Sequence, residues 1–197
     1  MNIKEPVTGS LTIEKSRFIA YLFPCDTEES YKEHLKDIRK KHYDASHVCS
    51  AFVSKDARRS SDDGEPAGTA GVPILNVLLK NDLCNVCALV VRYFGGIKLG
   101  AGGLIRAYGS TVSEALKDAV FSKEITMQHY ILPLSYELGN KVERFLENNT
   151  TLLAVEYEEK MIFRFASDDP AVLDKIQELT HGIKPNLLGE IITEKML

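Results

Sequence analysis

The sequence lacks the features that mark membrane, secreted and disulfide-rich proteins. None of its apolar runs approaches the length needed to span a bilayer. Its N-terminal stretch, Met1-Asn-Ile-Lys-Glu-Pro6, has neither the apolar segment nor the cleavage site of a signal peptide. Four cysteines in 197 residues, without the spacing of a disulfide framework, predict reduced thiols. We therefore expect a cytoplasmic protein with no membrane partner.

The chain also lacks a large excess of charge of either sign. It contains 24 Lys and Arg against 28 Asp and Glu, a net charge of −4. Residues 1–128 carry 17 basic and 16 acidic side chains, whereas residues 129–197 carry 7 and 12. Proteins that bind DNA without sequence preference are strongly basic. Any contact with a polyanion is therefore expected to be local and to lie in the first part of the chain.

Familiar catalytic signatures are missing as well. The sequence has no Gly-x-x-x-x-Gly-Lys-Ser/Thr phosphate loop, no dinucleotide fingerprint with its acidic ribose partner, no Gly-x-Ser-x-Gly and no His-Glu-x-x-His. No nucleophile stands beside an evident base. We assign no catalytic residue, no cofactor and no resident metal, and we expect a binding protein rather than an enzyme.

Hydrophobic patterns predict an α+β chain with two domains, residues 1–128 and 129–197. In the first we expect strands at 11–13, 17–23, 48–53 and 86–91, an exposed loop at 55–66, and helices at about 27–41, 69–79 and from Leu104 to Ala119. Asp26 and Glu29 are expected to cap the helix at 27–41. In the second we expect strands at 130–136, 151–158, 161–166 and 187–194 and helices at 137–148 and 170–181, which is the ferredoxin-like β-α-β-β-α-β order.

The densest feature is a glycine run that follows the strand at 86–91. Six of the 13 glycines fall within fifteen positions, and no acid occurs between Asp82 and Glu114. Glycines allow backbone N–H groups to approach a ligand, and a following helix adds free donors and a positive dipole end. Two interpretations stay open, an anion site and a tight turn that serves packing alone. The candidate anion or nucleic-acid contacts are Arg92, Tyr93, Phe94, Lys98, Gly100, Gly102, Gly103, Arg106 and Tyr108.

A second candidate is the polar loop that precedes the helix at 69–79. Asp62, Asp63 and Glu65 are able to hold a hard cation such as Mg²⁺, but they equally suit helix caps or a structural pairing with Arg92 or Arg106. His47 lies where a loop becomes a strand and suits either a general base or a hydrogen-bonded loop histidine.

Cys84 and Cys87 form a Cys-x-x-Cys pair. Redox pairs of this spacing normally open a helix, which lowers a thiol pKa, whereas Cys87 here enters a strand. A zinc site needs further ligands at a fitting spacing, which the sequence does not offer. We interpret the pair as coincidental thiols.

Three blocks together resemble the IMPACT family, in its bacterial YigZ-like branch. They are Ala45-Ser-His-Val-Cys49, Asp62-Asp-Gly-Glu-Pro-Ala-Gly-Thr-Ala-Gly71 and Arg92-Tyr-Phe-Gly-Gly-Ile-Lys-Leu-Gly-Ala-Gly-Gly-Leu-Ile-Arg-Ala-Tyr108. The resemblance implies an N-terminal domain of the ribosomal protein S5 domain 2-like fold. It also implies a ferredoxin-like C-terminal domain similar to the last domain of translocating elongation factors. Eukaryotic relatives are implied to regulate translation through protein binding.

Two functions are expected from these observations. The first is a non-enzymatic, translation-associated regulatory protein that contacts RNA, the ribosome or a translation factor through the glycine-rich cationic face. The alternative is a Mg²⁺-dependent enzyme that binds a nucleotide or phosphate metabolite, by analogy with small-molecule kinases of the S5-like fold.

Overall fold

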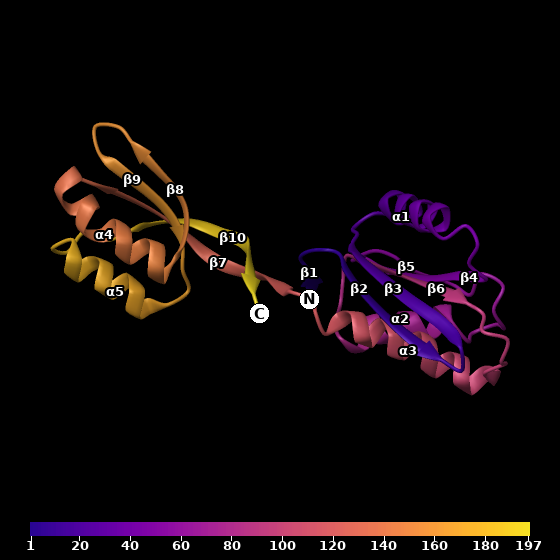
Figure 1. The fold of residues 1–197 in the computed structure, drawn as a ribbon. Helices are drawn as coiled ribbons and strands as arrows, with labels where there is room; N and C mark the ends of the chain where they lie inside the picture. Colours follow the sequence, from indigo (N-terminus) through magenta and orange to yellow (C-terminus); the bar gives the residue numbers. More distant parts are fainter. The chain divides into compact units, whose positions relative to one another are not determined.

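The computed structural model describes residues 1–197 and divides into two compact units. The N-terminal unit comprises Met1–Lys123 with Met196–Leu197, and the C-terminal unit comprises Glu124–Lys195. Both combine helices with antiparallel sheets, which confirms the predicted α+β class (Figure 1). None of the helices combines the length and the apolar composition that crossing a bilayer requires.

The N-terminal unit is built on a five-stranded antiparallel sheet. Its order is β2 (Val7–Ile13), β3 (Ser16–Pro24), β6 (Val86–Tyr93), β4 (His47–Val53) and β5 (Arg58–Ser61). β6 lies in the middle and is buried along nearly its whole length. A strand that is covered on both faces reads as a continuous apolar run, which explains why the sequence predicted it clearly.

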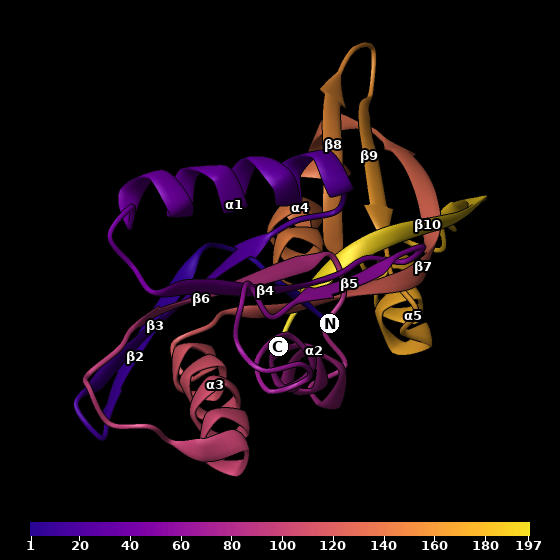
Figure 2. The ribbon, with the colours of Figure 1, turned by 90° about the vertical axis from the view of Figure 1, so that its right-hand side faces the viewer.

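Three helices cover the two faces of this sheet. α1 (Glu28–Lys41) lies on one face, whereas α2 (Gly71–Lys80) and α3 (Gly100–Leu116) lie on the other (Figures 1 and 2). Each face buries its own apolar cluster, the larger one under α2 and α3. The alternation of side chains along β3, β4 and β6 feeds both clusters at once.

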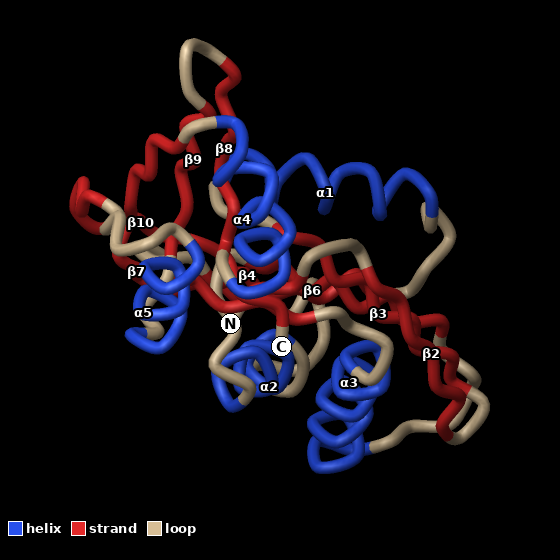
Figure 3. Tube along the Cα trace, turned by 90° about the vertical axis from the view of Figure 1, so that its left-hand side faces the viewer, coloured by secondary structure: helices blue, strands red, loops and turns tan.

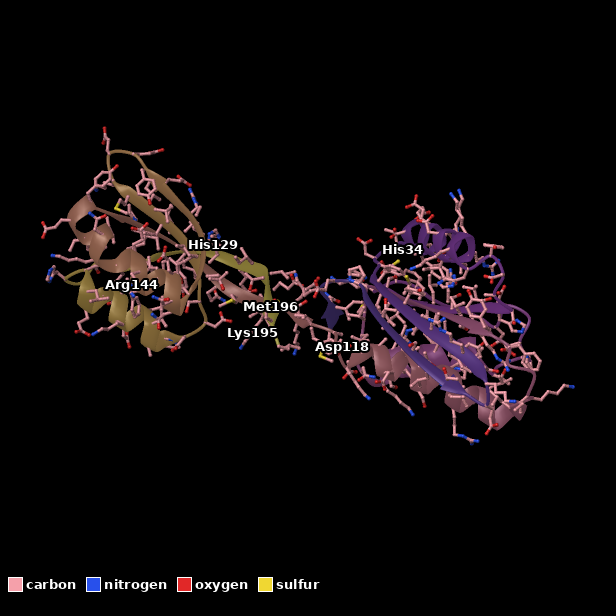
Figure 4. The ribbon with its side chains drawn as sticks, in the orientation of Figure 1. His34, Asp118, His129, Arg144, Lys195 and Met196 are labelled. Carbon is pink, nitrogen blue, oxygen red and sulfur yellow. The ribbon has the colours of Figure 1, made fainter.

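Aromatic contacts hold α1 on its face of the sheet. The ring of His34, which is labelled on α1 in Figure 4, stacks on Phe23 of β3 with 4.2 Å between centroids. Tyr31 stacks on Phe52 of β4 at 5.4 Å, and its hydroxyl forms a 2.7 Å hydrogen bond with that of Ser50. These contacts fix α1, and this helix also carries the ion-pair partner of Asp63.

The structure differs from the expected elements at several boundaries. The segment expected as a loop contains β5, a short exposed edge strand whose polar composition hid it. Thr27, not Asp26, caps α1, because its side chain accepts the hydrogen bond of the Ser30 N–H. α3 begins at Gly100, so that most of the glycine run is helical. The strand expected from residue 130 is β7 (Phe121–Leu134), whose first residues pair with β1 (Asn2–Ile3).

The C-terminal unit has the predicted β-α-β-β-α-β order. β7 is followed by α4 (Tyr136–Asn149), β8 (Thr151–Tyr157), β9 (Met161–Ala166), α5 (Pro170–Leu179) and β10 (Asn186–Met196). The strands lie in the order β10, β7, β9, β8, and both helices lie on the same side of this sheet (Figures 1 and 3). Leu132, Val142, Leu146, Phe163 and Ile176 form the centre of its core.

Candidate functional site

Strand register brings the first site residues together. His47 at the start of β4 lies opposite Arg92 near the end of β6, and Phe18 of β3 lies opposite Arg92 on its other side. Directly paired residues point to the same face of a sheet, so these three side chains face α2 and α3. The neighbouring Tyr93 points to the α1 face, where its hydroxyl lies 2.8 Å from Nδ1 of His42.

A buried ion pair forms the floor of this region. Nη1 of Arg92 donates to Oε1 of Glu65 at 2.6 Å, and the two side chains are only 6% and 3% exposed. The guanidinium lies between two aromatic rings, 5.4 Å from the centroid of Phe18 and 5.3 Å from that of Phe94. Its Nη2 donates to Oγ of Ser16 at 3.4 Å, whereas Nε is buried without a hydrogen-bond partner.

Tyr108 and Cys49 complete the buried network. The Tyr108 hydroxyl donates to the same Glu65 oxygen at 2.8 Å, and the Cys49 thiol donates to the Tyr108 oxygen at 3.3 Å. Burial raises the pKa of Cys49 to about 12. Burial, followed by the neighbouring Cys49 and Glu65, also raises the pKa of Tyr108. Both groups are therefore neutral donors at physiological pH, and neither is a nucleophile.

Two aspartates hold the loop that carries Glu65. Asp62 accepts backbone hydrogen bonds from Gly68, Ala70 and Gly71 at 2.8 to 3.0 Å. Burial alone would raise the pKa of Asp62, but these three N–H donors outweigh it and lower the pKa. Asp63 accepts from the Val48 N–H at 2.7 Å and pairs with Arg39 of α1. The loop is thus tied to α1, α2 and β4.

His47 is oriented by the same loop. Its Nδ1 lies 2.8 Å from the carbonyl oxygen of Asp63, which only accepts hydrogen bonds, so Nδ1 carries the proton. In the neutral ring, Nε2 is therefore an acceptor. It lies 3.9 Å from Oε1 of Glu65. Nε2 thus faces the buried ion pair.

The start of α3 contributes the positive end of a helix. No side chain caps this end, and its first turn contains no acid. Gly100 has a φ of +68°, a conformation that L side chains rarely adopt, and it leads into a turn made of Ala101, Gly102 and Gly103. The first N–H groups of a helix have no partners within it, and its dipole places about half a positive charge there.

A pocket of about 400 Å³ lies where these elements meet. Its polar walls are His47, Glu65, Arg92 and Lys98, together with Gly100 and Ala101 at the start of α3. Its apolar walls are Pro66, Phe94, Leu99 and Leu104. We refer to it as the α3 pocket. Chemically, it offers a fixed positive end, an exposed aromatic ring and one hydrogen-bond acceptor.

A second hollow adjoins the first and shares Lys98 and Leu99 with it. It has a volume of about 460 Å³ and includes Arg106, Gly103 and Glu14 among its walls. Lys98 and Arg106 are both exposed, and Glu14 is the one acid in this lining. Lys98 and Arg106 thus place two exposed cations beside the start of α3, and we refer to these two residues as the cationic margin.

The structure separates the residues that sequence reasoning grouped together. His47, Glu65, Arg92, Phe94, Lys98 and Gly100 line the α3 pocket. Tyr108 is fully buried and Tyr93 lies on the opposite face, so neither ring is available to a ligand there. Gly102 is exposed and lines neither hollow. Arg92 engages Glu65, the structural pairing that the sequence left open.

Several contributors were missed. Cys49 lies two residues after His47 on the same strand, so the period of two was a signal that both face the site. Ser16 accepts hydrogen bonds from Arg92 and from the Gly95 N–H, and it lies at the start of β3, distant in sequence. Leu99 and Leu104 read as ordinary core residues, and only the position of α3 shows that they line a pocket.

The remaining candidates have separate surroundings. Asp62, Asp63 and Glu65 have different partners, and no three His, Cys, Asp or Glu side chains are grouped to hold a metal ion. Cys84 is half-buried and Cys87 is buried, and all four cysteines are free. The Cys-x-x-Cys spacing therefore does not correspond to a joint site.

Comparison with known proteins identifies the family. The Impact N-terminal domain model matches residues 14–116, which contain every residue of the α3 pocket. The chain belongs to the IMPACT family. This confirms the resemblance carried by the three sequence blocks.

Whole-chain similarity extends to named IMPACT family members. YvyE of Bacillus subtilis is 41% identical over 196 residues, which cover 96% of this chain and 90% of that protein. YigZ of Escherichia coli is 38% identical over 167 residues, which cover 82% of each. A crystal structure described as a hypothetical protein is 34% identical, with a TM-score of 0.60 and 95% of both chains covered. The fold is therefore shared with that structure over 95% of each chain.

Proposed function

We propose that this IMPACT family protein is a non-enzymatic, translation-associated regulator that binds RNA through the cationic margin at the start of α3. The observation that carries the proposal is the start of α3 itself, uncapped and free of acids in its first turn, with Lys98 and Arg106 exposed beside it. Such an end attracts phosphate groups. Family membership supports the link to translation, which the resemblance to this family implies.

The proposed contact is smaller than the sequence suggested. Arg92 is neutralised by Glu65, so it stabilises the fold beneath the margin and does not meet a phosphate. Lys98 and Arg106 remain as phosphate contacts, and Phe94, which is 49% exposed, remains as a stacking surface for a base. A local contact of this size is compatible with the overall negative charge of the chain.

Salt dependence tests the proposal. Each neutralised phosphate of a single strand adds about 0.7 to the slope of log affinity against log salt, so two contacts predict a slope of about −1.4. Lys98→Glu combined with Arg106→Glu should abolish binding of a single-stranded RNA. A double variant of equal charge change, Lys80→Glu with Lys117→Glu, should retain it. RNA binding that does not change with salt concentration and is unaffected by the first double variant would refute RNA contact at this margin. If that variant still binds a translation factor, a protein partner is favoured.

The enzymatic alternative rests on the α3 pocket and on Nε2 of His47. A Mg²⁺-dependent reaction would need carboxylates that converge on the metal, whereas Asp62, Asp63 and Glu65 are held by separate partners. Thermal stabilisation by ATP or GTP that requires Mg²⁺ would favour the enzyme. An equal response with and without Mg²⁺ would favour a binding protein.

A further inference from the structure

We propose that the α3 pocket binds a single nucleoside monophosphate unit, a planar base that carries a phosphate monoester. Such a unit has two sources, a free mononucleotide and the phosphorylated end of an RNA strand. The inference rests on the proposed function and adds the ligand that its site recognises. It also assigns separate roles to the polar and the apolar walls of the pocket.

The anion end of the pocket lies at the start of α3. Gly100 and Ala101 line it and have no side chain large enough to cover the first N–H groups of the helix. Lys98 adds an ammonium from the preceding turn. Several donors that converge on one point suit the terminal oxygens of a phosphate.

Charge complementarity selects the monoester. Glu65 and Arg92 cancel, so the pocket carries Lys98 and about half a charge from the helix dipole, roughly +1.5 in total. A phosphate monoester carries about −1.5 to −2 at neutral pH, whereas a carboxylate or a phosphodiester carries only one charge. The monoester is the anion that comes closest to neutralising this pocket.

The apolar walls of the pocket suit a flat ring. Phe94 is 49% exposed, and Pro66, Leu99 and Leu104 complete the apolar walls. A volume of about 400 Å³ lies near the lower limit of small-molecule sites, about 300–1,000 Å³, which suits one mononucleotide. Aromatic rings hold nucleobases by stacking without a requirement for sequence.

His47 offers a ligand a polar atom on the pocket wall. The guanidinium of Arg92 is already bound to Glu65 and Ser16 and forms a fixed wall of the pocket. When the His47 ring is neutral, its Nε2 is an acceptor, because Nδ1 donates to the carbonyl oxygen of Asp63. A ring N–H or amino group of a base would satisfy Nε2. These atoms lie on elements that the fold already fixes.

Titration calorimetry on the full chain in EDTA tests the ligand class. The probes are AMP, adenosine and inorganic phosphate. AMP should bind at least tenfold more tightly than either of the others, because only AMP contacts both the phosphate-binding donors and the apolar walls. Equal affinity for phosphate and AMP, or no heat with AMP at millimolar concentration, would overturn the proposal.

A charged and a neutral variant of Ala101 test where the phosphate binds. Ala101 is exposed and lies in the first turn of α3, where an acid favours the helix, so Ala101→Asp should fold. It should weaken AMP binding by more than tenfold through repulsion. Ala101→Asn, which has nearly the same shape, should weaken it by less than about threefold. Phe94→Ala should cost about tenfold for AMP and leave phosphate binding unchanged. Equal losses in Ala101→Asp and Ala101→Asn would contradict a phosphate at this end.

Two RNA probes then distinguish the sources. Twelve-residue RNAs with a 5′-phosphate and with a 5′-hydroxyl are compared by fluorescence polarisation. Tighter binding of the phosphorylated strand supports recognition of a strand end, whereas AMP binding with equal RNA affinities supports a free nucleotide. If the protein binds RNA in a way that depends on salt and on Lys98 and Arg106 but does not bind AMP, the pocket proposal is overturned. The proposed function is then left intact. AMP binding without RNA binding overturns the proposed function alone.

Discussion

Glu65 and Arg92 form a buried ion pair, in which Oε1 of Glu65 lies 2.6 Å from Nη1 of Arg92. Their side chains are 3% and 6% exposed. They connect a polar surface loop to the central strand of the N-terminal unit. The pair also sets the charge of the α3 pocket, because it removes from the surface the cation that looked best placed to bind a phosphate. Its role in stability is testable separately from any ligand.

Glu65→Gln should destabilise the protein by about 3–5 kcal/mol, because it leaves the guanidinium of Arg92 buried without a counter-charge. The matched control is Glu28→Gln, which removes the exposed pair between Glu28 and Arg59. Exposed pairs contribute about 0–1 kcal/mol. Urea denaturation followed by circular dichroism measures both. Similar losses in the two variants would contradict the structural role of the buried pair.

Gly95→Ala should destabilise the fold by about 1–3 kcal/mol, because its Cβ would lie 2.0 Å from the carbonyl carbon of Lys15 and force the backbone to move. Gly102→Ala is the control. Its Cβ would meet only Nη1 of Arg106, at 3.6 Å, and alanine favours a helix over glycine by about 0.5–1 kcal/mol. The two melting temperatures should therefore move in opposite directions. A stable Gly95→Ala variant would show that this close approach is not required.

The lowered pKa of Asp62 predicts how the stability of the protein changes at acidic pH. Its pKa is lower in the folded protein than in the unfolded chain, where it is about 3.9, so its contribution to stability is complete above that value. The contribution is lost as the pH falls through the lowered folded pKa. The stability difference between wild type and Asp62→Asn should therefore be largest near neutral pH and shrink below about pH 4. Urea titrations at several pH values measure it, and a difference that stays constant would be contrary evidence.

Thiol labelling should distinguish Cys84 from the other cysteines. Cys84 is half-buried, whereas Cys25, Cys49 and Cys87 are 3%, 0% and 0% exposed. Burial also raises the pKa of Cys49 to about 12, which removes its thiolate at working pH. Mass spectrometry after brief iodoacetamide treatment at pH 8 should show one modification. None should appear on native Cys84→Ser, and fast labelling of Cys49 would contradict its burial.

Regular patterns made most of the fold predictable. The apolar run of β6 and the alternation in β8 and β9 each identified a strand, and Pro170 marked the start of α5 as expected. Boundaries were less certain where composition opposed the structure. β5 is a polar edge strand, and α3 begins inside a glycine run because packing on the sheet outweighs the low helix propensity of glycine.

The candidate site was located by its sequence blocks but not by the orientation of its side chains. Glu65 lies in a loop rich in polar residues, which gave no sign that its carboxylate is buried while Asp62 and Asp63 remain partly exposed. Tyr108 looked like a surface aromatic of a cationic segment, yet the helical period places it toward the sheet. The orientation of Glu65 depends on contacts between elements distant in sequence, which a local pattern does not encode.

The loop that holds Glu65 also bears on how fast a ligand binds. Its two aspartates are hydrogen-bonded to the backbone of α2 and β4 and to Arg39, so this wall of the α3 pocket is fixed before any encounter. A ligand then loses its own freedom but need not order the protein. Association should accordingly follow a single kinetic phase. Its observed rate constant should rise linearly with ligand concentration. Differences in affinity between variants should appear mainly in the dissociation rate.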